Sequence, residues 1–245
     1  MTSNPAQPPS DGWAESAEAW IASQGEAGDF GRRFVLDAPM MDIVRQGHFT
    51  NALDIGCGEG RFCRMLRAAG VTAVGIDPTA RLIDCAAERD PAGDYRVAHA
   101  ESLPFADAGF DLVVSYLSLI DIADIAAAIA EMARVLRPGG TLLIANLNGF
   151  NTAGQTLGWG RNWLGRAAFR MDHYLDERAD WISWRGIRIR NWHRPLSRYM
   201  ALLLKAGLVL THFAEPEPHG GDPARIARYR RAPHFMIMAW RKPSA

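Results

Sequence analysis

The sequence predicts an α/β protein with a Rossmann-like, doubly wound and mostly parallel sheet of seven strands. Between residues 52 and 145, short apolar runs alternate with helical segments, which is typical of a parallel sheet covered on both faces. The first apolar run leads into Gly56, Gly58 and Gly60 and then into a helical pattern. A strand, a glycine turn and a helix in this order present a nucleotide-like cofactor at the carboxyl edge of such a sheet.

Local signals place the remaining elements. The expected parallel strands are residues 52–55, 73–76, 95–97, 110–115 and 141–145, and the expected helices are 13–21, 31–45, 60–69, 79–89 and 122–135. Gly70 ends one of these helices, and the turn at residues 137–140 breaks the last. A helix over 195–206 and strands over 208–213 and 233–241 follow, and the two strands are expected to form an antiparallel hairpin at the sheet edge. Residues 149–198 show no clean period and are expected to be an insert.

Composition limits the classes of partner. The 245 residues carry 27 basic and 27 acidic side chains, so no overall field favours nucleic acid or an anionic membrane. The three cysteines lack metal-ligand spacing and are expected to be reduced thiols, with no metal bound. The first 12 residues lack the features of a signal peptide, and no apolar run approaches membrane-helix length. We therefore expect a cytoplasmic protein, monomeric or homodimeric, with neither a nucleic-acid nor a membrane partner.

The glycine spacing argues against two common cofactors. A dinucleotide loop reads G-x-G-x-x-G, whereas here Arg61 occupies the third glycine position. A phosphate-binding Walker loop requires a following Gly-Lys-Ser/Thr, and none is present. The cofactor is therefore expected to need close approach to the glycine backbone more than capture of a phosphate.

Four segments carry a resemblance to a known family. They are Asp54–Gly60, His99–Phe105, Phe110–Ser115 and the Leu-Arg-Pro-Gly-Gly turn at residues 136–140. In this order and spacing they resemble the motifs of the class I S-adenosylmethionine (SAM) methyltransferases. The resemblance covers residues 50–147 and is to the small-molecule, ubiquinone-biosynthesis or methyltransferase type 11-like enzymes. It implies SAM as cofactor and S-adenosylhomocysteine as product.

The resemblance implies a set of cofactor contacts. Asp77, 21 residues after Gly56, is expected to accept both ribose hydroxyls, and His99 stands where the family has an acid near adenine. Arg32 or Arg33 is expected to pair with the methionine carboxylate, although a solvated helix face explains either arginine equally well. The expected cofactor-binding residues are Asp54, Gly56, Cys57, Gly58, Asp77, Pro78, His99, Ala100, Glu101, Ser115, Arg32 and Arg33.

The acceptor is expected at the end of the fourth strand and in the insert. Between residues 159 and 198 lie nine arginines, four acids and five tryptophans, which suit a planar, aromatic or anionic acceptor, or equally a small lid core with a solvated arginine face. Many relatives carry a histidine pair where this chain has Ile120-Asp121, so Asp121 is either a substitute base or a helix N-cap. The expected substrate contacts are Tyr116, Leu119, Tyr174 and Trp192, and the expected catalytic bases are His193 first and His173 second.

The resemblance also implies a division of the chain and an activity. Residues 1–12 are expected to be disordered, residues 13–48 to form a helical cofactor lid, and residues 49–245 to form the SAM-binding domain with 149–198 as acceptor-side insert. The expected reaction is in-line transfer of the SAM methyl group to an O, N or C nucleophile of a small molecule. The alternatives are an RNA or protein methyltransferase and a non-catalytic SAM-binding domain.

Overall fold

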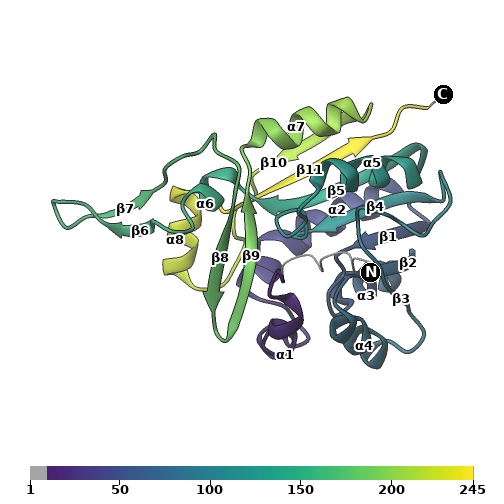
Figure 1. Ribbon diagram of the computed structural model, residues 1–245, viewed down its shortest axis with the longest axis horizontal. Helices are drawn as coiled ribbons and strands as arrows, with labels where there is room; N and C mark the ends of the chain where they lie inside the picture. Colours follow the sequence, from purple (N-terminus) through teal and green to yellow (C-terminus); the bar gives the residue numbers. More distant parts are fainter. Residues whose placement is uncertain (1–9, 245) are drawn as a thin grey trace, which may run out of the picture.

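A seven-stranded sheet forms the centre of the molecule (Figure 1). The computed structural model describes residues 10–244. The strands lie in the order β10-β11-β5-β4-β1-β2-β3, with β11 antiparallel to both of its neighbours and the other pairs parallel. The predicted doubly wound sheet with an antiparallel edge hairpin is thus confirmed. The strand bounds are β1 (Asn51–Ile55), β2 (Thr72–Asp77), β3 (Asp94–Val97), β4 (Phe110–Tyr116), β5 (Leu136–Leu147), β10 (Val209–Ala214) and β11 (Phe235–Arg241).

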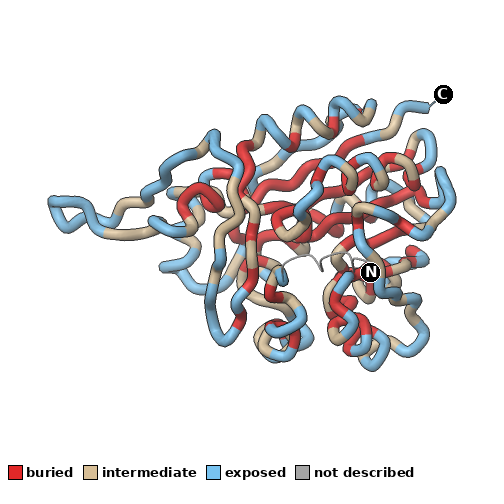
Figure 2. The backbone as a smooth tube through the Cα atoms, viewed as in Figure 1, coloured by how far each residue is buried: buried red, intermediate tan, exposed pale blue. Residues whose placement is uncertain are grey.

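Helices cover both faces of this sheet. Helices α5 (Ile125–Val135) and α7 (Leu196–Lys205) pack on one face, where Met132 and Leu203 lie in a shared apolar core with strand residues such as Ile144. Helices α2 (Asp37–Gly47), α3 (Arg61–Ala68) and α4 (Ala80–Arg89) contribute to the core on the other face. Figure 2 shows the central strands as the most deeply buried part of the chain. Burial on both faces explains why the strands read as continuous apolar runs.

The N-terminal segment reaches across the molecule to the insert. Helix α1 (Trp13–Gln24) is followed by a short π-helix, η1 (Arg32–Leu36), which runs directly into α2. The backbone oxygen of Asp11 accepts a hydrogen bond from the amide of Arg190 at 2.8 Å, and Ser16 Oγ bonds to the backbone of Arg188. Disorder was expected over residues 1–12. Residues 1–9 lie outside the described part, and residues 10–12 are ordered against the insert.

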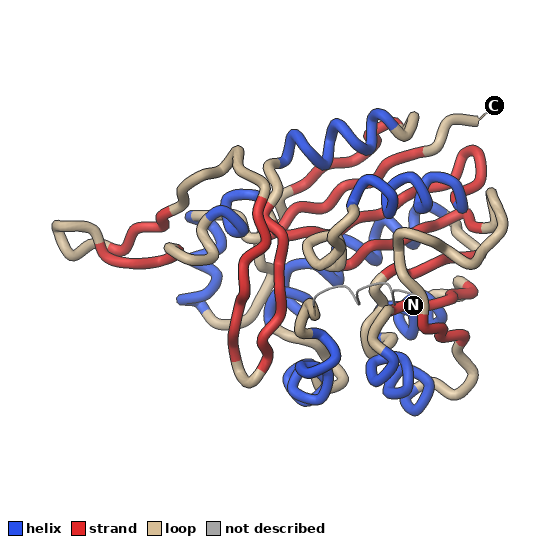
Figure 3. Tube along the Cα trace, in the orientation of Figure 1, coloured by secondary structure: helices blue, strands red, loops and turns tan. Residues whose placement is uncertain are grey.

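The insert is more regular than its sequence indicates (Figure 3). It contains a short helix, α6 (Gly149–Ala153), and two antiparallel hairpins, β6 (Gly158–Arg161) with β7 (Ala167–Arg170) and β8 (Arg178–Trp184) with β9 (Ile187–His193). In β9 the odd-numbered side chains are buried, whereas Arg188 and Arg190 alternate with them, which is the two-residue period of a strand. Helix α8 (Pro223–Arg231) lies between β10 and β11 and was not predicted. Within residues 10–244, no helix combines the length and the apolar character needed to cross a membrane.

Candidate functional site

The loop between β1 and α3 is shaped by its glycines. Gly56, Gly58 and Gly60 have φ of 74°, 55° and 75°, a left-handed region that side chains with a Cβ rarely adopt. A Cβ on Gly56 would lie 2.4 Å from the Cβ of Ser118, so the loop packs directly against the segment after β4. The amides of Gly56 and Cys57 both donate to the backbone oxygen of Ile76, at 2.8 and 2.9 Å. The loop is therefore held at the carboxyl ends of β1, β2 and β4.

This loop forms the floor of a pocket whose other walls come from the N-terminal helices and from β4. Six of the residues that line the pocket were predicted as site residues: Arg32, Asp54, Gly56, Cys57, Gly58 and Tyr116. Four more were not predicted: Trp20, Glu59, Arg61 and Phe62. Trp20 comes from α1 and Arg32 from η1. The segment expected to act as a lid therefore contributes a wall to the glycine-loop pocket.

Asp54 is a buried acid with an unused acceptor atom. Its side chain is 1% exposed, and its Oδ2 accepts a weak hydrogen bond from Cys63 Sγ at 3.4 Å. Oδ1 has no hydrogen-bond partner among the described residues. Burial raises the pKa of this carboxyl to about 7. A buried acid that lines a pocket and has one oxygen without a partner suits a ligand that brings a cationic donor, such as the ammonium group of a bound amino acid.

Asp77 ends β2 beside the glycine loop. Its Oδ2 accepts from the Gly58 amide at 3.0 Å and its Oδ1 from the Thr79 amide at 2.8 Å. Burial raises the pKa of Asp77 to about 6, although both of these amide bonds favour the ionised form. Because each carboxylate oxygen has two lone pairs, both oxygens retain acceptor capacity for a pair of vicinal hydroxyls.

The structure separates the two candidate arginines. The guanidinium carbon of Arg32 lies 4.9 Å from the ring centre of Trp20 and 5.8 Å from that of Tyr116, and Arg32 lines the pocket. Its Nη1 pairs with Asp29 at 2.8 Å. Arg33 stacks over the ring of Phe34 instead and is not among the lining residues. Arg32 is thus the member of the pair placed to meet an anionic group of a ligand.

Three residues expected near the cofactor or the acceptor have surroundings that differ from the expected ones. Tyr116 lines the glycine-loop pocket, where its hydroxyl donates to Asp37 Oδ1 at 2.7 Å, so it belongs to the expected cofactor side. Ser115 is fully buried, and its hydroxyl bonds to Ser118 Oγ at 2.7 Å. Leu119 is also fully buried in the apolar core, which leaves it no surface for an acceptor.

The turn after β3 lies outside the lining of this pocket. His99 is exposed, Ala100 is buried and Glu101 is partly buried. Pro78, at the end of β2, is exposed. The contact of these residues with an adenine ring stays a prediction from the family resemblance.

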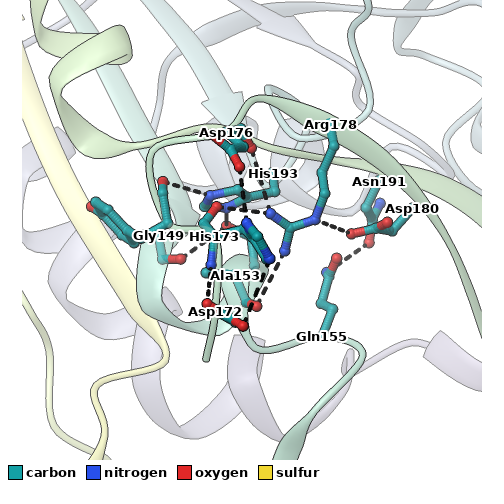
Figure 4. Close-up of polar contacts among 12 residues, drawn as sticks. Gly149, Ala153, Gln155, Asp172, His173, Asp176, Arg178, Asp180, Asn191 and His193 are labelled. Atoms are coloured by element: carbon teal, nitrogen blue, oxygen red, sulfur yellow. Dashed lines mark hydrogen bonds and ion pairs between the residues drawn. The ribbon is translucent and has the colours of Figure 1, made fainter. Parts of the chain in front are cut away.

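The two candidate histidine bases belong to a network inside the insert (Figure 4). His193 is fully buried; its Nε2 lies 2.9 Å from the backbone oxygen of Tyr174 and its Nδ1 lies 2.7 Å from Thr152 Oγ1. Burial lowers the pKa of His193, which keeps the ring neutral with the proton on Nε2. His173 lies on an exposed turn, 3.0 Å from Asp176. Both ring nitrogens of His193 are thus already bonded within the protein, which argues against a role as base, and that role stays a prediction.

The expected acceptor contacts in the insert also serve its packing. The Tyr174 hydroxyl accepts from the Leu196 amide at 3.2 Å. The amide of Trp192 donates to the backbone oxygen of Ile120 at 2.6 Å, and Arg194 stacks over its ring at 4.7 Å. The bond between Trp192 and Ile120 joins β9 to the segment after β4.

Asp121 is not the cap of the following helix. Helix α5 begins at Ile125, and its N-cap is Asp124, whose Oδ1 accepts from the Ala127 amide at 3.0 Å. Asp121 Oδ1 instead accepts from Asn191 Nδ2 of β9 at 2.5 Å, and burial raises the pKa of Asp121 well above its usual range. Asp121 therefore ties the insert to the end of β4.

A doubly wound sheet with a glycine-loop pocket at its carboxyl edge defines a nucleotide-type cofactor site. Residues 53–144 match the family model described as a methyltransferase domain. This part of the chain is therefore similar to methyltransferase domains.

Comparisons with known proteins extend the match. A malonyl-[acyl-carrier protein] O-methyltransferase of Serratia marcescens is 39% identical over 95 residues, which are 39% of this chain and 37% of the relative. One from Erwinia pyrifoliae is 32% identical over 129 residues, 53% of this chain and 48% of the relative. These matches thus span less than half the length of either relative. A solved SAM-dependent methyltransferase from Mesorhizobium loti shares the fold, with a TM-score of 0.73, 24% identity and coverage of 84% of this chain and 99% of that one.

Proposed function

We propose that this protein transfers the methyl group of SAM to a small-molecule acceptor, and that the acceptor atom is a carboxylate oxygen. The observation that carries the cofactor assignment is Asp54, a buried acid with an unpartnered oxygen on the floor of the glycine-loop pocket. A phosphate-bearing nucleotide would bring a negative charge toward this acid, whereas the methionine end of SAM brings an ammonium group. The resemblance to methyltransferases over residues 53–144 supports the same cofactor.

Each wall of the pocket has a role in this proposal. Asp54 accepts from the ammonium group of the methionine moiety, and Arg32 pairs with its carboxylate. Asp77 lies beside the glycine loop and outside the lining of the pocket, and it accepts from the ribose hydroxyls with the acceptor capacity that the Gly58 and Thr79 amides leave free. Trp20 and the N-terminal helices exclude water from this end of the pocket.

The state of the histidines favours an acceptor that needs no base. Bound SAM supplies an activated methyl donor, so the protein has to orient the nucleophile and keep water away. His193 has both nitrogens occupied, and His173 lies on an exposed turn. Among the described residues that line the pocket there is no histidine. A carboxylate is already ionised at neutral pH and can attack without proton transfer, unlike a phenol or an amine. Two relatives are named as O-methyltransferases of a malonyl group, which agrees with this acceptor class.

The proposal is tested by incubating the protein with methyl-labelled SAM and a panel of acceptors. The panel contains free carboxylic acids, a malonyl group on acyl-carrier protein, phenols, amines and a structured RNA. We expect label in a base-labile methyl ester, and we expect D54N to lower its yield strongly at a limiting SAM concentration while R33A retains it. Label in the phenols, the amines or the RNA would refute the carboxylate acceptor. Tight SAM binding with no turnover on any acceptor would favour a non-catalytic SAM-binding domain.

A further inference from the structure

The β6–β7 hairpin projects from the body of the molecule (Figure 1). Trp163 is 90% exposed and Leu164 is 54% exposed. Six of the twelve large apolar side chains that are exposed in the described part of the chain fall between residues 150 and 175: Phe150, Leu157, Trp163, Leu164, Met171 and Leu175. Trp163 and Leu164 are adjacent at the tip, and neighbouring exposed apolar side chains of this size indicate an interaction site.

The same hairpin and the neighbouring helix α8 carry a concentrated positive charge. Residues 158–170 and 223–231 together contain seven arginines and no acid. Arg231 joins the two elements, since its Nη2 donates to the backbone oxygen of Ala167 at 2.8 Å and its guanidinium lies 4.8 Å from the ring centre of Trp159. Of the seven, only Arg230 forms an ion pair with a described residue, Glu217. We call residues 158–170 together with α8 the arginine-tryptophan projection.

The turn at the tip of the hairpin is closed by hydrogen bonds among its own residues. Asn162 Oδ1 accepts from the amides of Leu164 and Arg166, both at 3.0 Å, and the Gly165 amide donates to the Asn162 oxygen at 2.9 Å. Arg161 Nη1 donates to the Gly165 oxygen at 2.6 Å. Because these backbone groups are satisfied within the turn, the tip can enter a region of low polarity without leaving them unpaired.

We propose that the arginine-tryptophan projection docks the protein on an anionic phospholipid surface, with Trp163 and Leu164 in the interface and the arginines against the headgroup phosphates. Tryptophan partitions into the membrane interface, and arginines near an anionic leaflet are attracted to it. This surface is independent of the cofactor pocket and goes beyond the proposed methyl transfer. It differs from the expectation, drawn from the balanced overall charge, that no membrane is a partner.

Two other partners fit these observations less well. Nucleic acid uses arginines and aromatic rings, but Leu157, Leu164 and Met171 offer nothing to a base or a phosphate. An acidic protein would need about 800 Å² of complementary surface on each side for a stable contact. A projecting hairpin with strands of four residues offers little flat area, whereas insertion of its tip into a soft lipid interface needs no matching surface.

The experiment is co-flotation of the full chain with vesicles of phosphatidylcholine alone or of equal parts phosphatidylcholine and phosphatidylglycerol. We expect binding to the anionic vesicles that weakens with salt. W163S/L164S should lower the affinity by about tenfold or more, because the apolar contact is lost. R166Q/R228Q should lower it about 25-fold at low salt, at about 1 kcal/mol for each arginine. The hydrogen bonds of Arg166 and Arg228 to described residues involve only their backbone atoms, so both substitutions should leave the fold intact.

Matched variants separate the projection from general surface effects. R45Q/R96Q removes the same charge from α2 and β3, and W184S/L204S removes exposed apolar side chains from β8 and α7. Both should bind vesicles like the wild type. Brominated lipid should quench the fluorescence of Trp163, and W163F should lose that quenching. The proposal is overturned if the wild type does not bind anionic vesicles, if the control pairs weaken binding as strongly as the projection pairs, or if the projection variants impair retention on RNA alone.

Discussion

Replacement of Asp54 by asparagine should stabilise the ligand-free protein and weaken its affinity for SAM. The carboxyl has a pKa of about 7 in the folded protein against 3.8 for the free side chain. From this difference, ionising it inside the fold costs roughly 4 kcal/mol at a pH above 7 and roughly 2 kcal/mol near pH 5. The stability that the protonated acid contributes is thus present below pH 4 and is lost as the pH rises through 7. Because asparagine does not ionise, D54N does not lose this stability as the pH rises.

The expected outcome is a stability gain for D54N that is larger near pH 8 than near pH 5, by about 2–3 kcal/mol. For a chain of this length, that difference corresponds to about 5–10 °C in Tm. Thermal unfolding of the ligand-free protein at the two pH values measures it. In the same variant the affinity for SAM should fall by about 10–100-fold, since a charge-assisted hydrogen bond is lost.

A second buried acid is the matched control. Asp111 is 2% exposed, but its oxygens accept from the Thr50 amide and hydroxyl and from the Asn51 amide at 2.7–3.0 Å. D111N should therefore lower stability near pH 8, the opposite sign to D54N. If D54N also destabilises the protein near pH 8, or shifts Tm equally at both pH values, the description of Asp54 as an uncompensated buried acid is wrong.

Three further substitutions test other parts of the site. G56A should abolish SAM binding and lower Tm, because the new Cβ would lie 2.4 Å from that of Ser118 at a φ of 74°; wild-type affinity by calorimetry would contradict this. R32A should raise the Kd for SAM by about tenfold or more while R33A leaves it unchanged, and equal effects would show that the pocket does not select Arg32. H193Q should lower Tm by several degrees through lost buried hydrogen bonds, with kcat of the remaining folded enzyme retained; a selective loss of kcat with an altered pH profile would restore its role as base.

The sheet was predictable because its signals are local. Each central strand is buried on both faces and reads as an apolar run, and glycines mark the turns. The insert was not predictable in the same way. The strands of its hairpins carry arginine and tryptophan at exposed positions. In β9 the buried, inward-facing positions include the polar residues Asn191 and His193, so the strand does not read as an alternation of apolar and polar residues. Tertiary contacts to α1, not side-chain polarity, decide which face of β9 is buried.

The residues of the candidate site likewise divide into those that the sequence predicts and those that it does not. Asp54, Gly56 and Asp77 were found from spacing along the chain, because a strand and the loop after it hold them together. Trp20 was missed because it reaches the pocket from a helix that precedes β1, and a single tryptophan in a helical pattern carries no sign of that contact. The sequence neighbourhood of His193 does not reveal that Thr152 and Tyr174 contact both of its ring nitrogens, because these contacts form only in the folded insert.

The central claim is that the pocket above Gly56 and Asp54 holds SAM and not a dinucleotide. Calorimetric titration of the wild type and D54N with SAM, S-adenosylhomocysteine and NAD tests it most directly. The structure predicts one site per chain for SAM and for S-adenosylhomocysteine, weaker binding of both to D54N, and no binding of NAD. Binding of NAD at least as tight as that of SAM, or affinity for SAM that D54N leaves unchanged, would contradict the claim.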